Sequence, residues 1–189
     1  MGFGISKETK NEFCPENIQL LIVDIQEKLF PKIDHREELL KNTQILIETA
    51  KILNIPIILS EQYPSGLGQT LPEIKSLLPE NTPSVEKLHF SCMQHPGFES
   101  KLQDRKLVMV VGIETHVCIY QTVSDLILKD YWVWVPADAV GSRTKLNWKT
   151  GLSLMEREGA WIASTENLIF RLLKTAGTEN FKKIAKLLK

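Results

Sequence analysis

The chain has 189 residues, a length that suits one domain with a substantial core. Its 23 Lys and Arg residues balance its 23 Asp and Glu residues, so no overall basic charge draws it to nucleic acid or to an anionic membrane surface. The three cysteines are odd in number and show no CxxC spacing, which argues against a disulfide framework and a structural zinc site. We therefore expect a single domain over residues 1–189 in a reducing compartment, with a small uncharged or mildly charged partner.

The N-terminal segment is polar and interrupted by charges, and we expect about residues 1–16 to form a tail. No apolar run in the sequence approaches the roughly 18 residues that span a bilayer, and no secretory leader is evident, so we expect a cytoplasmic protein. Gly2 with Ser6 satisfies the N-myristoylation pattern, but so short a pattern arises easily by chance.

Apolar runs of strand length then alternate with longer amphipathic stretches. The first run ends at Asp24, and its continuous apolar residues 20–23 are typical of a strand buried on both faces. We predict strands at 18–24, 56–60, 84–89, 106–112, 131–136 and 161–164, and helices at 36–53, 72–78, 116–129, 146–157, 166–174 and 179–188. This alternation predicts an α/β fold, a three-layer sandwich in which helices cover both faces of a mainly parallel sheet.

The longest irregular segment in this scheme is 61–70. It carries Pro64, Gly66 and Gly68, and its length suits a binding loop better than a hairpin. The glycines do not form Gly-x-Gly-x-x-Gly, and no Gly-Lys-Ser/Thr follows, so a nucleotide site is not expected.

Polar residues at the carboxyl ends of parallel strands are the strongest functional candidates, because ligands of open parallel sheets bind at that edge. Asp24 closes the first predicted strand, Lys87 lies near the end of the third, and Cys118 follows the fourth after a short turn. Each has an ordinary structural explanation, since Asp caps turns, Lys tips are solvated and apolar Cys is often inert. Together they form a plausible mechanism, in which Asp24 is the general base and the helix N-terminus and Lys87 favour a Cys118 thiolate.

Three segments in this order carry a family resemblance. LIVDIQ at 21–26, EKLHFS at 86–91 and VGIETHVC at 111–118 resemble the Asp, Lys and Cys motifs of isochorismatase-like hydrolases. EQYPSGLG at 61–68, the turn at 138–143 and FKKI at 181–184 look like the subgroup called isochorismatase domain-containing proteins. Several separated matches in one order are far more specific than any single motif.

The resemblance implies a six-stranded parallel sheet and a catalytic triad of Asp24, Lys87 and Cys118. It also implies a cis peptide between Ile113 and Glu114, with the backbone amides of Glu114 and Cys118 forming an oxyanion hole. We expect the substrate pocket to be lined by Gln26, Phe30, Tyr63, Phe90 and His116.

The histidines suggest two other kinds of site. His116 lies two residues before Cys118, but no Cys/His family motif accompanies it, so we expect it to line the pocket or hydrogen-bond the turn. Nicotinamidases of this superfamily hold a metal through histidines that follow the second strand, and the corresponding stretch here, 60–64, contains no His. We therefore predict no metal site and no cofactor.

Three functions remain open at this point. The first is hydrolysis of a small amide, imide or ester through a thioester on Cys118. The second is isochorismate vinyl-ether hydrolysis, which is disfavoured because enzymes known for that reaction resemble this family but carry Gly at the position of Cys118. The third is a non-catalytic binding or scaffold protein that retains the triad as a pocket.

The apolar surface also predicts self-association. Trp132 and Trp134 alternate along one predicted strand, and the apolar helix 119–128 precedes them. This is more hydrophobic surface than one compact domain needs, and the family is usually oligomeric, so we expect a homodimer or a larger homo-oligomer.

Overall fold

The computed structural model describes residues 13–103 and 105–189, so the Gly2 and Ser6 pattern lies outside the described residues. The strands are β1 (Ile18–Val23), β2 (Ile57–Gln62), β3 (Ser84–Lys87), β4 (Leu107–Ile113), β5 (Trp132–Pro136), β6 (Val140–Gly141) and β7 (Trp161–Ala163). The helices of two turns or more are α2 (Arg36–Ile52), α5 (Tyr120–Leu128), α6 (Lys145–Glu158) and α7 (Thr165–Leu173). Shorter helices are α3 (Pro64–Leu67), α4 (Pro72–Lys75) and α8 (Glu179–Ile184).

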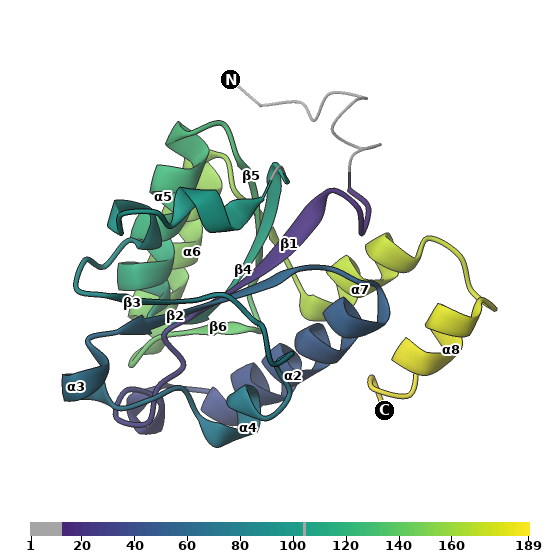
Figure 1. Cartoon of the computed structure of the whole chain (residues 1–189), viewed down its shortest axis with the longest axis horizontal. Coiled ribbons are helices and arrows are strands. Elements are labelled where there is room, and N and C mark those ends of the chain that lie inside the picture. The colour runs from purple at the N-terminus through teal and green to yellow at the C-terminus, as the bar shows by residue number, and fades with distance from the viewer. Residues whose placement is uncertain (1–12, 104) are drawn as a thin grey trace.

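The sheet is parallel and runs in the order β3-β2-β1-β4-β5-β7, with the two-residue β6 paired to β4 off this path (Figure 1). The expected α/β fold is confirmed, and the six expected strands are the six of the main path; the short β6 is additional. β1 lies in the middle, where Val23 is in register with Ser60 of β2 and with Gly112 of β4. Three strand ends therefore meet at one point of the carboxyl edge.

Alternate residues of β1 belong to two separate cores, which makes the molecule three-layered. Ile18, Leu20 and Ile22 face the core beneath α2 and α7, whereas Leu21 and Val23 face the core beneath α5 and α6. Figure 1 shows α2 and α7 on one face of the sheet and α5 and α6 on the other. All six side chains of β1 are buried, as expected of a strand covered on both faces.

Local signals fix where the long helices begin. Thr144 accepts a hydrogen bond from the Asn147 amide at the start of α6, and Gly159 ends α6 in a left-handed conformation. Ser164 and Asn167 form a reciprocal capping box at the start of α7. Because Asp138 also accepts from the amide and hydroxyl of Thr165, both at 2.8 Å, the start of α7 is anchored to the loop after β5.

Some boundaries differ from those expected. β2 continues to Gln62, and residues Pro64–Leu67 form the short helix α3, so the segment 61–70 is less irregular than its composition suggested. The helix expected at 116–129 begins as a π-helical turn, Thr115–Ile119, and becomes α5 at Tyr120. The helix expected at 72–78 ends at Lys75.

The described chain begins inside the core and not in a tail. Phe13 is 1% exposed and packs edge-on against Trp134, with ring centroids 4.7 Å apart. The Arg171 guanidinium lies over both rings, 4.8 Å from each centroid. Phe13, which was expected to lie in the tail, thus anchors this end of the described chain to the core. Within the described ranges, no helix is both long and apolar enough to cross a bilayer.

Candidate active site

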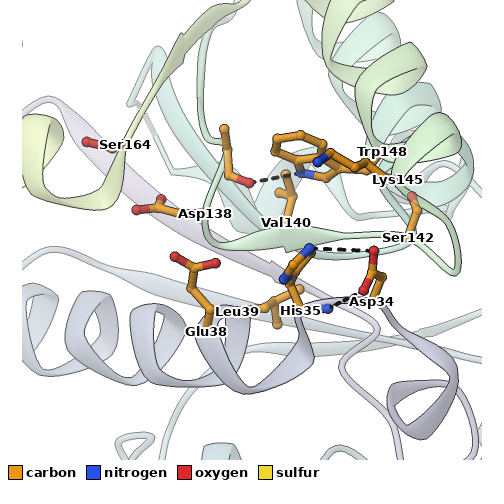
Figure 2. Close-up of a pocket in the computed structure, with 11 residues that line it drawn as sticks. Asp34, His35, Glu38, Leu39, Asp138, Val140, Ser142, Lys145, Trp148 and Ser164 are labelled. Atoms are coloured by element: carbon orange, nitrogen blue, oxygen red, sulfur yellow. Dashed lines mark hydrogen bonds and ion pairs between the residues drawn. The ribbon is translucent and has the colours of Figure 1, made fainter.

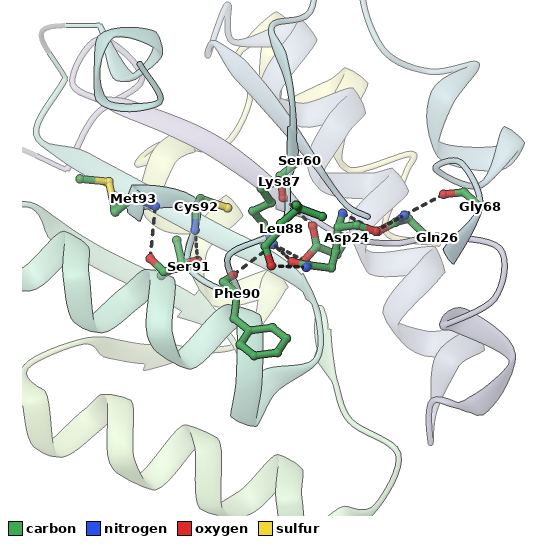
Figure 3. A network of polar contacts seen from close by, with 12 residues as sticks. Asp24, Gln26, Ser60, Gly68, Lys87, Leu88, Phe90, Ser91, Cys92 and Met93 are labelled. Atoms are coloured by element: carbon green, nitrogen blue, oxygen red, sulfur yellow. Dashed lines mark hydrogen bonds and ion pairs between the residues drawn. The ribbon is translucent and has the colours of Figure 1, made fainter. Parts of the chain in front are cut away.

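Asp24 follows the last residue of β1 and is completely buried. Its backbone turns out of the strand with φ of 55°, a conformation that Asp tolerates better than most residues. The Asp24 amide donates to the Ser60 carbonyl at 3.1 Å, and Oδ1 accepts from the Ser60 hydroxyl at 2.8 Å. Oδ2 accepts from Lys87 Nζ at 2.7 Å (Figure 3). Both carboxylate oxygens therefore have fixed partners.

Lys87 reaches this carboxylate from the end of β3, and its side chain is also fully buried. Its ammonium donates three hydrogen bonds: to Asp24 Oδ2, to Gln62 Oε1 at 2.8 Å and to the Phe90 carbonyl at 3.0 Å. Gln62 is held in turn, because its Nε2 donates to the Leu88 carbonyl at 2.8 Å. The three protons of the ammonium are thus all engaged, as a buried charge requires.

The charge of Lys87 is stabilised by its surroundings. Burial alone lowers the pKa of the ammonium, but the negative charge of Asp24, followed by the buried thiols Cys92 and Cys118, outweighs burial and raises the pKa above its ordinary value. Lys87 is therefore a permanent cation in this site.

Cys118 lies in the π-helical turn that follows β4 and is 6% exposed. The peptide bond between Ile113 and Glu114 is cis, at the position where the family resemblance places one. Gly112 has φ of 123°, and a Cβ there would overlap the Val23 carbonyl, so the approach to the turn depends on glycine. The Glu114 carbonyl accepts from the amides of Val117 and Ile119, at 3.0 and 3.2 Å. The amide of Cys118, which lies between Val117 and Ile119 in the sequence, does not donate to the Glu114 carbonyl.

The Cys118 thiol is protonated at neutral pH, contrary to the expectation of an enhanced thiolate fraction. Burial raises the pKa of the thiol far above its usual value, and the charge of Asp24 and a hydrogen bond to it raise it further, against the opposing effect of Lys87. The sequence argument gave weight to the helix N-terminus and the ammonium but could not anticipate the depth of burial. Asp24, Lys87 and Cys118 are nonetheless brought together as one electrostatic unit.

A second thiol, Cys92, belongs to the same surroundings and was not anticipated. It is completely buried, and burial followed by the charge of Asp24 raises its pKa to about 11, while Lys87, Ser60 and Thr122 oppose the shift. Ser60 and Gln62, which hold Asp24 and Lys87, were also missed. Ser60 ends the second predicted strand, so the carboxyl-edge argument that selected Asp24 could have found it.

Of the five residues expected to line the pocket, the two polar ones form hydrogen bonds within the chain. Gln26 is fully buried and engaged with backbone: its Nε2 donates to the carbonyls of Gln62 and Gly68, and its Oε1 accepts from the Gln62 amide. His116 Nδ1 shares a 3.0 Å hydrogen bond with Ser142 Oγ. These two side chains therefore hold loops around the site in place.

The three aromatic candidates are separated. Phe30 is half-buried and packs on the core beneath α2. Tyr63 and Phe90 are each 51% exposed and flank Lys87, since the Tyr63 amide donates to the Lys87 carbonyl and the Phe90 carbonyl accepts from its ammonium. The backbones of Tyr63 and Phe90 thus contact Lys87, whereas Phe30 packs on the core beneath α2.

The stretch that would carry metal ligands in nicotinamidases has a structural role here. Glu61 is buried, and its Oε1 accepts from the amide and the hydroxyl of Thr70, at 2.6 and 2.7 Å. Among the described residues, no three or more His, Cys, Asp and Glu side chains are grouped so that they could hold a metal ion.

Comparison with known proteins defines the class. The family model of the isochorismatase domain matches residues 19–167, and the chain belongs to this family. It is 35% identical to mouse isochorismatase domain-containing protein 2A, over 97% of this chain and 88% of that protein. It is 38% identical to the secreted isochorismatase effector Isc1 of Phytophthora sojae, over 98% of this chain and 91% of that protein.

Solved structures agree with this assignment. A Caenorhabditis elegans protein described as MAR1 ribonuclease is 39% identical and superposes with a TM-score of 0.88, over 93% of this chain and 91% of that chain. The Escherichia coli YcaC gene product, described as an octameric hydrolase of unknown specificity, is 20% identical and has a TM-score of 0.86, over 92% of this chain and 89% of that chain. The latter likeness concerns the fold alone.

Proposed function

We propose that this protein is a cysteine hydrolase that cleaves a small amide, imide or ester through a thioester on Cys118. The observation that carries the proposal is the buried Asp24–Lys87 pair, whose carboxylate hydrogen-bonds the Cys118 thiol and raises its pKa. A protonated thiol beside a carboxylate suits proton transfer during attack, because the carboxylate can take the proton as the sulfur attacks.

In the first half of the reaction, Asp24 takes the thiol proton while Cys118 Sγ attacks the substrate carbonyl carbon. The carbonyl π electrons move to oxygen and form a tetrahedral oxyanion. The backbone amides of Glu114 and Cys118 donate to this oxygen in the proposed mechanism. Collapse of the intermediate breaks the bond to nitrogen or oxygen, and protonated Asp24 gives its proton to the leaving group, which leaves a thioester on Cys118.

In the second half, Asp24 takes a proton from water as the water oxygen attacks the thioester carbonyl. Collapse of this second tetrahedral intermediate releases the acid, and the proton returns to Cys118 Sγ. Lys87 does not transfer a proton in this scheme, because its three protons are fixed on oxygen acceptors. Its positive charge holds the Asp24 carboxylate in place and offsets the negative charge that the thiol develops.

We assign substrate contact first to the candidate side chains that are exposed to solvent. Tyr63 and Phe90, beside Lys87, offer an apolar border for an acyl or planar substrate. His116 is proposed to line the pocket or to hold the nucleophile turn through Ser142. Gln26 is proposed as a positioning residue, since its amide is used by the backbone at 62 and 68. Phe30 is the weakest of the five candidates because it packs on the core beneath α2.

Intact-protein mass spectrometry after brief exposure to small activated esters and amides tests the proposal. We expect an acyl adduct on Cys118 in the wild type and loss of turnover by at least about a thousandfold in Cys118→Ala. Cys14→Ala, a change at a half-buried cysteine outside the site, is the matched control and should turn over normally.

Other outcomes would favour the alternatives. Isochorismate turnover that survives Cys118→Ser would support vinyl-ether hydrolysis. Absence of both adduct and turnover throughout the panel would support a binding or scaffold protein. An RNA oligonucleotide belongs in the panel because a relative is described as a ribonuclease, and metal-independent RNA cleavage that survives Cys118→Ala would contradict the thioester mechanism.

We also propose that the chain forms a homodimer or larger assembly in a reducing, cytoplasmic setting. The reason differs from the one expected, because Trp134 is buried and stacks on Trp161 at 5.0 Å within the chain's own core. The apolar side chains that remain exposed include Leu88, Phe90 and Leu128. A monomeric mass by light scattering at micromolar concentration would contradict self-association.

A further inference from the structure

A separate cavity of about 340 Å³ opens at the carboxyl edge of the sheet, and none of Asp24, Lys87 and Cys118 lines it (Figure 2). It lies where the first turns of α2 and α6 and the residue that caps α7 meet β6. This volume falls within the range of small-molecule sites. The cavity meets the nucleophile turn through Ser142, which lines it and hydrogen-bonds His116.

The floor of the cavity is apolar and fixed. Leu39 and Val140 are buried in the two cores, and both line the cavity. Trp148 forms part of the wall, and its indole N–H donates to the Ala137 carbonyl at 3.0 Å, which anchors the ring (Figure 2). An apolar body can therefore be buried here against side chains that do not have to reorganise.

Carboxylates dominate the charged rim. Glu38 of α2 and Asp138 of the loop after β5 both line the cavity, and Asp34 lies beside His35 (Figure 2). Within the part of the chain that the structure describes, the Glu38 carboxylate has neither a hydrogen bond nor an ion pair, and the Asp138 carboxylate accepts only from Thr165. The Lys145 ammonium is the cation that faces this rim, and it too is unpaired in the described structure.

The positive ends of the helix dipoles do not cancel the negative charge of the cavity rim. Amides at the starts of α6 and α7 donate to Thr144 and Ser164, so these donors are already used. Glu37 and Glu38 lie in the first turn of α2 and offset its positive end. Asp34 is engaged with His35, whose amide donates to Oδ1 and whose ring lies 3.6 Å from Oδ2. The Glu38 and Asp138 carboxylates against the one Lys145 ammonium still leave the cavity negative, which favours a cationic ligand over an anionic one.

We propose that this cavity is a second ligand site, for a small organic ammonium ion that carries an apolar body. The ammonium group donates to Glu38 and Asp138, while the apolar body lies on Leu39, Val140 and the Trp148 ring. The proposal is independent of the chemistry at Cys118, because none of these five residues belongs to the triad.

The test uses 2-phenylethylammonium as the probe, with phenylacetate and 2-phenylethanol as anionic and neutral analogues of similar shape. Titration of the ¹⁵N-labelled protein at pH 8 should shift the indole resonance of Trp148, assigned from its disappearance in Trp148→Phe. The indole resonances of Trp132, Trp134 and Trp161 should stay in place. We expect the ammonium to bind at least about fivefold more tightly than either analogue, since a charge-assisted hydrogen bond is stronger than a neutral one.

Two variants of equal charge locate the interaction. Glu38→Gln should weaken binding of 2-phenylethylammonium by about tenfold, because it removes a carboxylate of the rim. Glu37→Gln, one residue earlier on α2 and outside the cavity, should change binding by less than about twofold, since its charge is exposed and screened.

Three results would overturn the proposal: tighter binding of phenylacetate than of the ammonium, equal weakening by both variants, or no movement of the Trp148 resonance at millimolar probe. Circular dichroism and thermal melting of each variant establish that a loss of binding is not a loss of fold. The binding measurement does not depend on hydrolysis at Cys118. A failure of this proposal is therefore distinguishable from a failure of the proposed thioester mechanism.

Discussion

The Asp24–Lys87–Cys118 cluster and the cavity lie at the same edge of the sheet, but the charged groups are buried and paired in the first and more exposed in the second. At the triad, Asp24 and Lys87 have fully buried side chains, and each polar atom of the pair is held by a named partner (Figure 3). In the cavity, Glu38 and Lys145 are exposed and, in the described structure, without partners (Figure 2). The first region resembles a reaction centre, where dipoles are oriented before the substrate arrives, and the second leaves its charges free to meet a ligand.

The largest expected effect of this contrast is on stability. Lys87→Met leaves the Asp24 carboxylate buried without its counterion, which costs about 3–5 kcal/mol when one partner of a buried pair is removed. Lys145→Met, the same change at the cavity, should leave the free energy of unfolding unchanged within error because its ammonium is exposed. Urea unfolding of both variants at pH 7 measures the difference, and equal losses would mean that the two regions do not differ in this way.

A pair of glycines gives the next largest difference. Gly112 has φ of 123°, and an alanine Cβ would overlap the Val23 backbone, so Gly112→Ala should cost about 3 kcal/mol or more and disturb the nucleophile turn. At Gly141, beside the cavity, the added Cβ meets the tips of Ile33 and Leu39 at 2.6 and 2.7 Å. Because these contacts are with side-chain methyl groups and not with backbone, a small adjustment relieves them, and Gly141→Ala should cost less than Gly112→Ala, about 1 kcal/mol. Thermal unfolding ranks the two, and the reverse order would contradict the packing described here.

The sequence was sufficient to predict the sheet, and it placed Asp24, Lys87 and Cys118 at the edge where the structure brings them together; their catalytic roles remain a proposal. Alternation of apolar runs with amphipathic stretches is a local signal that the sequence shows directly. The rule that ligands bind at the carboxyl ends of parallel strands then predicts that Asp24, Lys87 and Cys118 lie close together. Phe13 was missed because a lone aromatic in a polar segment gives no periodicity. Its burial depends on Trp134 and Arg171, which are distant in sequence.

The electrostatic state of the site could not be predicted in the same way. The sequence shows that a helix N-terminus and a lysine are near Cys118, and both favour a thiolate. It does not show that the thiol is almost completely buried, and burial, followed by the charge of Asp24, reverses the sign of the pKa shift. The partners of Lys87 are likewise nonlocal, since Gln62 is 25 residues away along the chain.

The third prediction concerns the pKa of the Cys118 thiol. Because the pKa of Cys118 is raised, its alkylation by iodoacetamide should be slow at pH 7 and still rise with pH above pH 9, where an ordinary cysteine has levelled off. Asp24→Asn removes a negative charge beside the thiol, so it should lower the apparent pKa by about one unit or more, which is about 1.4 kcal/mol, and speed alkylation while abolishing turnover.

This measurement is made in a background of Cys14→Ser and Cys92→Ser so that a single thiol is followed. Near-UV circular dichroism checks that the Asp24→Asn protein is folded, since Lys87 keeps only Gln62 and the Phe90 carbonyl as partners. A wild-type thiol that titrates near pH 8.5 would show that Cys118 is not buried beside Asp24 in solution.

The smallest effect is expected at Ser142, which connects the two regions. Ser142 is 1% exposed, it lines the cavity, and its hydroxyl shares one hydrogen bond with Nδ1 of His116, two residues before the proposed nucleophile Cys118. Ser142→Ala should therefore reduce stability by about 1 kcal/mol, the usual net contribution of one such bond. The more informative readout is the His116 imidazole, because the bond to Ser142 fixes which ring nitrogen carries the proton. In the wild type, saturation with 2-phenylethylammonium should shift the ¹⁵N resonances of His116, whereas in Ser142→Ala they should no longer respond although the probe still binds. An unchanged response in the variant would mean that the cavity and the nucleophile turn are not connected through this bond.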